Sequence, residues 1–146
     1  NVVNRFLEII KPKYIVLGKK DLQQLRLINS HILKRKIKTR IIKCKIIREK
    51  NGVACSTRNK NLTNKQLKIA SKIYLYLFNK KKELKKSLSN FSETDLINNI
   101  INLGSKKVDY VELLNSKTLN PIKKKEEKFR IFVAYYLDNI RLIDNI

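Results

Sequence analysis

The pattern that most constrains the fold is a short apolar run that ends in a glycine and leads into a helical repeat of apolar residues. The run covers residues 14–17, and Gly18 follows it. The expected helix runs from Asp21 to about Lys36, and its apolar face consists of Leu22, Leu25, Ile28 and Ile32. Residues 39–47 are rich in β-branched side chains and predict a second strand, parallel to the first because a helix connects the two. This arrangement predicts half of a doubly wound α/β sheet.

The remaining segments predict a short helix at the start and a second domain after residue 60. Residues 2–10 repeat apolar side chains at helical spacing. A capping-box signature at Thr63 and Gln66 begins a helix that we expect to end near residue 82. Ser92 caps a further helix that stops at Gly104.

Three strand-like runs follow these helices. They cover residues 107–114, 128–137 and 140–145, and the Asp138-Asn139 step suits a tight turn between the last two. We therefore expect residues 1–60 to contain the doubly wound sheet and residues 61–146 to form a small α+β domain with an antiparallel sheet.

The strong positive charge is a weak guide to function in this chain. The net charge is +22, with 26 Lys against 8 Arg, and values of this size usually indicate nucleic acid as a partner. However, Lys, Ile and Asn, which A/T-rich codons encode, make up 62 of the 146 residues. The lysine runs at 80–82 and 123–125 also lack the interleaved aromatic residues on which bases stack. A basic RNA-binding or ribosome-associated protein therefore stays an alternative that only charge favours.

Cysteine usage and hydropathy indicate a protein of a reducing compartment. Cys44 and Cys55 form no CxxC pair, and with one histidine the chain offers no zinc set. No apolar stretch of 18 residues occurs, which argues against a transmembrane helix. We expect reduced thiols, a cytoplasmic location, no membrane partner and no protein-bound metal cluster.

Two segments combine residue types that suit the binding of a polyphosphate. Gly18 and Lys20 lie where a strand gives way to a helix, and a helix N-terminus attracts anions at the carboxyl edge of an α/β sheet. Residues 56–59 follow a glycine turn at Gly52 and supply two hydroxyls, an arginine and an amide, a set suited to binding a polyphosphate through charge-assisted hydrogen bonds. Together the two segments predict a nucleotide site.

Four segments resemble the pantothenate synthetase (pantoate–β-alanine ligase) family in order and approximate spacing. They are VLGKKDLQQL at 16–25, IREKNGVACSTRN at 47–59, DYVEL at 109–113 and IRLIDN at 140–145. The resemblance covers nearly the whole chain. It implies that residues 1–60 are the second half of a doubly wound, nucleotidyltransferase-like domain of the Rossmann type, and that residues 61–146 are the small domain that follows it.

The resemblance implies an ATP-dependent ligation in two steps. ATP adenylates the carboxylate of pantoate and pyrophosphate leaves; β-alanine then attacks the pantoyl adenylate, which gives pantothenate and AMP. ATP and Mg²⁺ are the implied cofactors, and pantoate and β-alanine the small-molecule partners. The resemblance also implies a homodimer at full length, with no specific nucleic-acid partner.

Site roles follow residue by residue from the same resemblance. The implied ATP-binding set is Gly18, Lys19, Lys20, Asp21, Ile47, Cys55, Ser56, Thr57 and Arg58. Lys20 and Arg58 are the implied catalytic residues, because they face charge that shifts during adenylation, and Gln24 is the implied pantoate ligand. Two plainer readings stay open: Lys20 as an ordinary surface lysine, and Asp21 as a helix cap.

The chain departs from the family pattern in several places. Cys55 and Thr57 stand where the family usually has methionine and serine, and Lys19 replaces a frequently acidic or polar residue. The family's His-containing motif has no match, since His31 falls inside the predicted helix, where we expect a solvated or partly packed residue. The chain also contains no methionine. We therefore expect a C-terminal fragment that is inactive alone.

Overall fold

The chain forms two compact units, Asn1–Ile46 and Ile47–Ile146. The computed structural model describes residues 2–122 and 128–146. The units divide at Ile46 and Ile47, earlier than the domain boundary that the sequence predicts after residue 60. The assignment of the two parts as domains stays a prediction.

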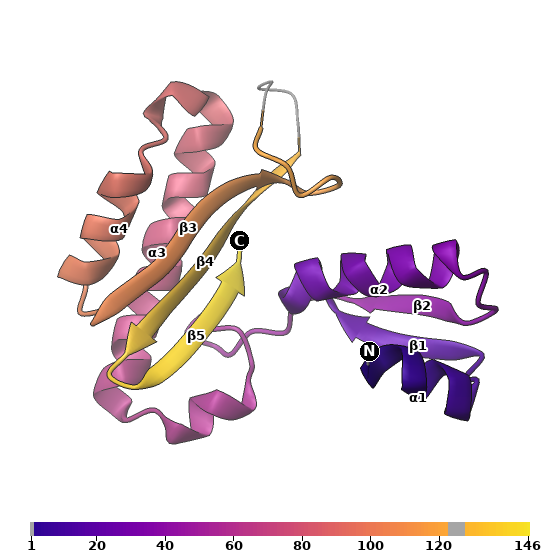
Figure 1. The fold of residues 1–146 in the computed structure, drawn as a ribbon. Coiled ribbons are helices and arrows are strands. Elements are labelled where there is room, and N and C mark those ends of the chain that lie inside the picture. Colours follow the sequence, from indigo (N-terminus) through magenta and orange to yellow (C-terminus); the bar gives the residue numbers. More distant parts are fainter. Residues whose placement is uncertain (1, 123–127) are drawn as a thin grey trace. The chain divides into compact units, whose positions relative to one another are not determined.

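The first unit is a β-α-β arrangement preceded by a helix (Figure 1). Helix α1 covers Val2–Ile10, strand β1 Tyr14–Gly18, helix α2 Leu22–Lys34 and strand β2 Arg40–Cys44. The two strands are parallel, with Tyr14 opposite Arg40 and Gly18 opposite Cys44. The predicted strands and their parallel pairing are confirmed, although β2 ends at Cys44 and not at residue 47.

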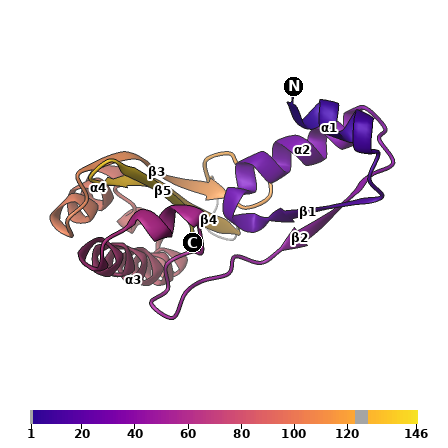
Figure 2. The ribbon, with the colours of Figure 1, turned by 90° about the horizontal axis from the view of Figure 1, so that it is seen from below.

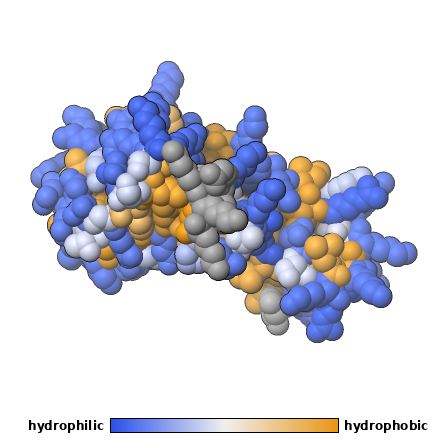
Figure 3. All heavy atoms as spheres, turned by 90° about the horizontal axis from the view of Figure 1, so that it is seen from above, coloured by the Kyte–Doolittle hydropathy of each residue, from blue (hydrophilic) through white to orange (hydrophobic). Residues whose placement is uncertain are grey.

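Alternating side chains of β1 separate a packed face from an exposed one. Ile15 and Leu17 pack with the buried cluster that Leu7 of α1 forms with Ile28 and Ile32 of α2. Tyr14 and Val16 point the other way and are 46% and 64% exposed. Orange hydrophobic residues are accordingly visible on the surface of this unit, at the right of Figure 3.

His31 has a structural partner inside the first unit. Its Nε2 lies 2.6 Å from Oδ1 of Asn4, so the ring links α2 to α1, and the residue is half-buried. The expectation of a partly packed helix residue is confirmed.

The second unit combines two long helices with a three-stranded sheet (Figures 1 and 2). A 3₁₀ helix at Thr57–Asn61 precedes helix α3 at Asn64–Lys86, and a second 3₁₀ turn at Leu88–Asn90 leads to helix α4 at Glu93–Asn102. Strands β3 (Lys107–Asn115), β4 (Phe129–Leu137) and β5 (Ile140–Asn145) form an antiparallel sheet in the order β3-β4-β5. The three predicted strands are confirmed.

Capping groups fix the helix ends as the sequence predicts. The hydroxyl of Thr63 accepts from the backbone N–H of Gln66, and the side chain of Gln66 accepts from the backbone N–H of Thr63, which completes the capping box. Ser92 accepts from the backbone N–H of Asp95 at the start of α4. Helix α3 continues to Lys86, one turn beyond the predicted end, because Leu84 still packs in the core at 0% exposure.

The core of the second unit lies between its helices and its sheet. Leu77, Leu84, Leu96 and Ile100 of the helices pack in one cluster with apolar residues of β3 and β4. Asp138 has a φ of +51° in the turn between β4 and β5, a conformation that aspartate tolerates better than most residues.

Candidate functional site

The first predicted segment lies at the carboxyl end of β1. A single 3₁₀ turn at Lys19–Asp21 carries the chain from β1 into α2. Gly18 has an extended conformation, with φ −75°, and the 3₁₀ turn that follows it makes the change of direction. A Cβ at Gly18 would meet nothing within 4 Å. The described fold therefore does not itself require a glycine at this position.

Four side chains of the predicted set surround this strand-to-helix junction. Asp21 is exposed at the N-cap position of α2, and its side chain makes no capping hydrogen bond. The plain reading of Asp21 as a cap is therefore wrong. Lys19 and Lys20 are half-buried, and Gln24 is exposed in the first turn of α2. The junction thus combines a helix N-terminus with lysine, carboxylate and amide side chains, which are suited to a polar anionic ligand.

The second predicted segment begins as a tight reverse turn in the second unit. The backbone N–H of Cys55 donates to the carbonyl of Ile47 at 2.9 Å, and that of Glu49 donates to the carbonyl of Val53 at 2.9 Å. Gly52 closes the turn with φ +85°, and a Cβ there would collide with the ring of Tyr74. Glycine is required here both by conformation and by space.

Arg48 attaches this turn to the rest of the second unit. Its Nη1 and Nη2 donate to Asp144 Oδ2 and Oδ1 at 2.6 and 3.0 Å. Its guanidinium lies 4.4 Å from the ring centroid of Tyr74, and Nη1 also donates to the carbonyl of Gly52 at 3.0 Å. These bonds explain why residues 47–60 belong to the second compact unit.

Asp144 and Asn145 have structural partners in the second unit. Asp144 binds Arg48, and the amide oxygen of Asn145 accepts from Arg130. Burial, with Arg48 nearby, lowers the pKa of Arg130. Both residues link the last strand to other parts of the second unit.

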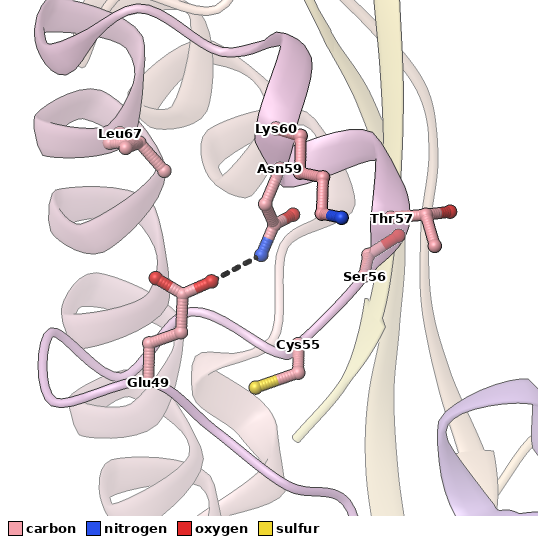
Figure 4. Close-up of a pocket in the computed structure, with 7 residues that line it drawn as sticks. All are labelled: Glu49, Cys55, Ser56, Thr57, Asn59, Lys60 and Leu67. Carbon is pink, nitrogen blue, oxygen red and sulfur yellow. Dashed lines mark hydrogen bonds between the residues drawn. The ribbon is translucent and has the colours of Figure 1, made fainter.

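A pocket of about 560 Å³ opens beside the predicted phosphate-binding residues, within the second unit (Figure 4). Its lining comprises Glu49, Cys55, Ser56, Thr57, Asn59, Lys60 and Leu67. Ser56 Oγ accepts from the backbone N–H of Arg58 at 3.3 Å, which fixes the start of the 3₁₀ helix. The hydroxyls of Ser56 and Thr57, with the ammonium of Lys60, give this pocket donors for an oxyanion.

The structure assigns the predicted residues to two places. Gly18, Lys19, Lys20, Asp21 and Gln24 lie in the first unit, whereas Ile47 and residues 55–58 lie in the second. Cys55, Ser56 and Thr57 line the pocket; Arg58 and Ile47 are exposed and do not. Sequence reasoning gave no role to Glu49, Lys60 and Leu67, although Glu49 falls inside the quoted 47–59 segment; Asn59 belongs to the predicted polyphosphate-binding set.

Metal ligands, cysteines and membrane spans can be assessed in the described ranges, 2–122 and 128–146. No group of three or more His, Cys, Asp or Glu side chains there is placed to hold a metal ion. Cys44 and Cys55 are free and exposed. Among the same residues, no helix has the length and apolar character needed to cross a membrane.

Comparison with known proteins places the chain in one enzyme family. The model of the Pantoate-beta-alanine ligase family matches residues 1–146, and the chain belongs to this family. Pantothenate synthetases of Clostridioides difficile and Flavobacterium psychrophilum are 39% and 35% identical to it; each alignment covers 99% of this chain and 52% of the relative. The chain therefore spans about half the length of the curated relatives it matches.

Solved structures agree with the family and with the fold. The Francisella tularensis pantoate-beta-alanine ligase, complexed with beta-gamma ATP and beta-alanine, matches with a TM-score of 0.72 and 34% identity, over 99% of this chain and 47% of that one. A pantothenate synthetase of Thermus thermophilus shares the fold, with a TM-score of 0.79 at 24% identity, over 99% of this chain and 53% of its own. The predicted fold class, part of a doubly wound α/β domain followed by a small α+β domain, is confirmed.

Proposed function

We propose that this chain supplies the phosphate-binding and pantoate-binding groups of a pantoate–β-alanine ligase. The observation that carries the proposal is the pocket that Ser56 and Thr57 line, directly before Arg58, in a chain of the ligase family. The similar Francisella tularensis ligase was solved in complex with beta-gamma ATP and beta-alanine, which supports ATP as the nucleotide.

In the proposed first step, a carboxylate oxygen of pantoate attacks the α-phosphorus of ATP. The bond from that phosphorus to the bridging oxygen breaks, and pyrophosphate leaves with the electron pair. Lys20 stabilises the negative charge that grows on the α-phosphate oxygens. Arg58, Ser56 and Thr57 hold the departing pyrophosphate through charge-assisted hydrogen bonds, and Cys55, an exposed residue, borders the same anion.

In the proposed second step, the amine of β-alanine attacks the carbonyl carbon of the pantoyl adenylate. AMP leaves, the nitrogen loses a proton, and pantothenate remains. Gln24 holds pantoate through its amide, and Asp21, whose carboxylate is not used for capping, accepts from the ribose hydroxyls. The open space at Gly18 leaves room for the nucleoside, Ile47 is an exposed residue that contacts the adenine in this proposal, and Lys19 adds positive charge.

At this site Mg²⁺ would bind mainly to the phosphates of the nucleotide and less to protein side chains. Mg²⁺ usually binds substrate phosphates, water and one or two carboxylates. Within the described part of the chain no cluster of three or more ligand side chains offers a protein cage, whereas Asp21 is exposed beside the proposed site. When bound, Mg²⁺ would neutralise phosphate charge.

We propose that activity requires the part of the relatives that this chain does not cover. The chain aligns with about half of those proteins, so we expect purified chain to release no AMP above a no-enzyme control. We also propose that the complete enzyme is a cytoplasmic homodimer without a specific nucleic-acid partner.

Titration of the purified chain with ATP tests the proposed binding groups. We expect weak ATP binding by calorimetry, reduced about tenfold or more in Lys20→Ala and in Arg58→Ala, because each removes a cation from the phosphates. Lys117→Ala and Arg35→Ala, which remove exposed cations elsewhere, are the matched controls. Equal losses in all four variants would show a general charge effect and overturn the assignment.

A further inference from the structure

We propose that Asn59, acting through Glu49 and the carbonyl of Ala54, is a positioning residue for the Ser56-Thr57-Arg58 turn. The inference rests on the proposed function, because it concerns the pyrophosphate-binding turn of that site. The sequence motif counts the amide of Asn59 among the groups that suit a polyphosphate; the inference gives Asn59 a positioning role instead, and it gives Glu49 a role that neither the motif nor the family comparison assigns.

The side chain of Asn59 makes two hydrogen bonds across the turn, and we call this pair of bonds the clasp. Its Nδ2 donates to Glu49 Oε1 at 2.7 Å and to the carbonyl of Ala54 at 3.1 Å. The bond to Ala54 closes a ring around residues 55–58, four residues of the implied ATP-binding set. Figure 4 shows the amide of Asn59 reaching from the 3₁₀ helix to Glu49 across the pocket.

Burial distinguishes Asn59 from its neighbours in the turn. Asn59 is only 9% exposed, whereas Thr57, Arg58 and Lys60 are exposed. Its Oδ1 has no hydrogen-bond partner among the described residues, so the amide is held by its donor nitrogen alone. Aspartate, which has nearly the same shape but no donor when ionised, cannot make either bond.

The clasp has two consequences for an anion in the pocket. First, it holds the turn in its bound form before the ligand arrives, which lowers the entropy lost on binding. Second, Glu49 lines the same pocket, and its negative charge would repel the phosphates. The hydrogen bond that Asn59 donates to Glu49 Oε1 partly offsets that charge. Without the Asn59 amide, the turn is less ordered before the ligand binds, and the carboxylate of Glu49 repels the anion more strongly.

Titration with inorganic pyrophosphate, followed by NMR of the complete 146-residue chain, tests the clasp. We expect Asn59→Ala to weaken binding about tenfold, the scale of one or two lost hydrogen bonds. Asn59→Asp should weaken it at least as much. The matched control is Asn61→Ala, an exposed residue of the same 3₁₀ helix, which should bind as wild type does.

A double variant separates positioning from charge and from general damage. Glu49→Gln with Asn59→Asp keeps the net charge and restores the bond between residues 49 and 59 with donor and acceptor exchanged, whereas the bond to the carbonyl of Ala54 stays lost. We expect it to recover part of the affinity that Asn59→Asp loses. Wild-type affinity in Asn59→Ala, or no recovery in the double variant when both proteins melt like wild type, would overturn the proposal.

Hydrogen exchange tests the positioning role of Asn59 separately from the proposed function. The amides of Asn59 and Leu62 donate to the carbonyls of Ser56 and Asn59 at 3.1 Å in each case, and they report on order in the turn. We expect faster exchange of both in Asn59→Ala, and exchange in the double variant that is slower than in Asn59→Asp. If wild type itself bound no pyrophosphate, the proposed function would fail, and unchanged exchange in Asn59→Ala would separately overturn the clasp.

Discussion

Arg48 combines three kinds of contact at the start of the functional turn. It makes a bidentate ion pair with Asp144, stacks on Tyr74 and donates to the carbonyl of Gly52. The side chains of Arg48 and Asp144 are only 20% and 12% exposed, so solvent screens the pair less than it screens a surface pair. The position of the turn for which we propose phosphate binding therefore depends on Arg48, a side chain to which we assign no ligand.

Removal of this arginine should lower stability markedly. We expect Arg48→Met to reduce the free energy of unfolding by about 2–4 kcal/mol, because it leaves the Asp144 carboxylate largely buried without its partner. Chemical denaturation measures the change. Arg5→Met is the control: its 3.9 Å pair with Glu8 is exposed, so the loss should stay below about 0.5 kcal/mol. Similar losses in the two variants would contradict the role of Arg48 as an anchor.

Sequence pattern predicted the elements of this chain well and its site less completely. The capping groups and the apolar periodicity are local signals, so α3 and the strands of the antiparallel sheet were predictable. Gly18 and Gly52 show what local sequence cannot predict. Gly52 needs its positive φ and the space that Tyr74 leaves, whereas Gly18 needs neither. The roles of Arg48 and Asn59 depend on partners that only the folded chain brings near, and the sequence gives no signal for them.

Helix α3 carries a lysine whose ionisation should be visible in stability. Burial, with Arg130, Lys85 and Arg48 nearby, lowers the pKa of Lys81 to about 8 from an ordinary 10.5. Between these values the unfolded chain retains a proton that the folded chain has lost, so the contribution of Lys81 to stability rises with pH across that window. Below about pH 8 the ammonium is charged in both states, and its partial burial destabilises the fold.

Replacement of this lysine should therefore act in a pH-dependent way. We expect Lys81→Met to melt at a higher temperature than wild type at pH 7, and the difference to shrink as the pH is raised toward 10. Thermal unfolding of both proteins at several pH values measures it. Lys65→Met, an exposed lysine at the start of the same helix, is the control. A difference that grew with pH would contradict the lowered pKa.

The net charge of the molecule and its pocket indicate different ligands. The charge favours nucleic acid, whereas the pocket favours a small molecule that carries phosphate. A net charge of +22 attracts any polyanion, whereas the pocket that Ser56 and Thr57 line belongs to the turn for which we propose phosphate binding. The first unit also exposes apolar side chains on β1. We interpret the charge as a bulk property of a lysine-rich composition, and the turn as the specific feature.

Nucleic-acid binding should accordingly be weak in salt and without sequence preference. We expect affinity for RNA to fall by about 10³-fold or more between low and physiological salt, because release of counterions from the phosphates supplies the binding free energy. Gel shifts with unrelated RNA sequences at several salt concentrations measure this. A tight complex that persisted at high salt would favour the RNA-binding alternative.

The most direct measurement of the central claim is pyrophosphate exchange into ATP by this chain joined to the N-terminal half of the Francisella tularensis ligase. We expect pantoate-dependent exchange, lowered about 10²-fold or more by Lys20→Ala or Arg58→Ala, the scale of one lost electrostatic donor. Gln24→Ala should mainly raise the KM for pantoate. The Francisella C-terminal part in the same fusion is the positive control. If Lys20→Ala and Arg58→Ala left the exchange rate intact, or if Gln24→Ala weakened ATP binding and not pantoate binding, the account would be contradicted.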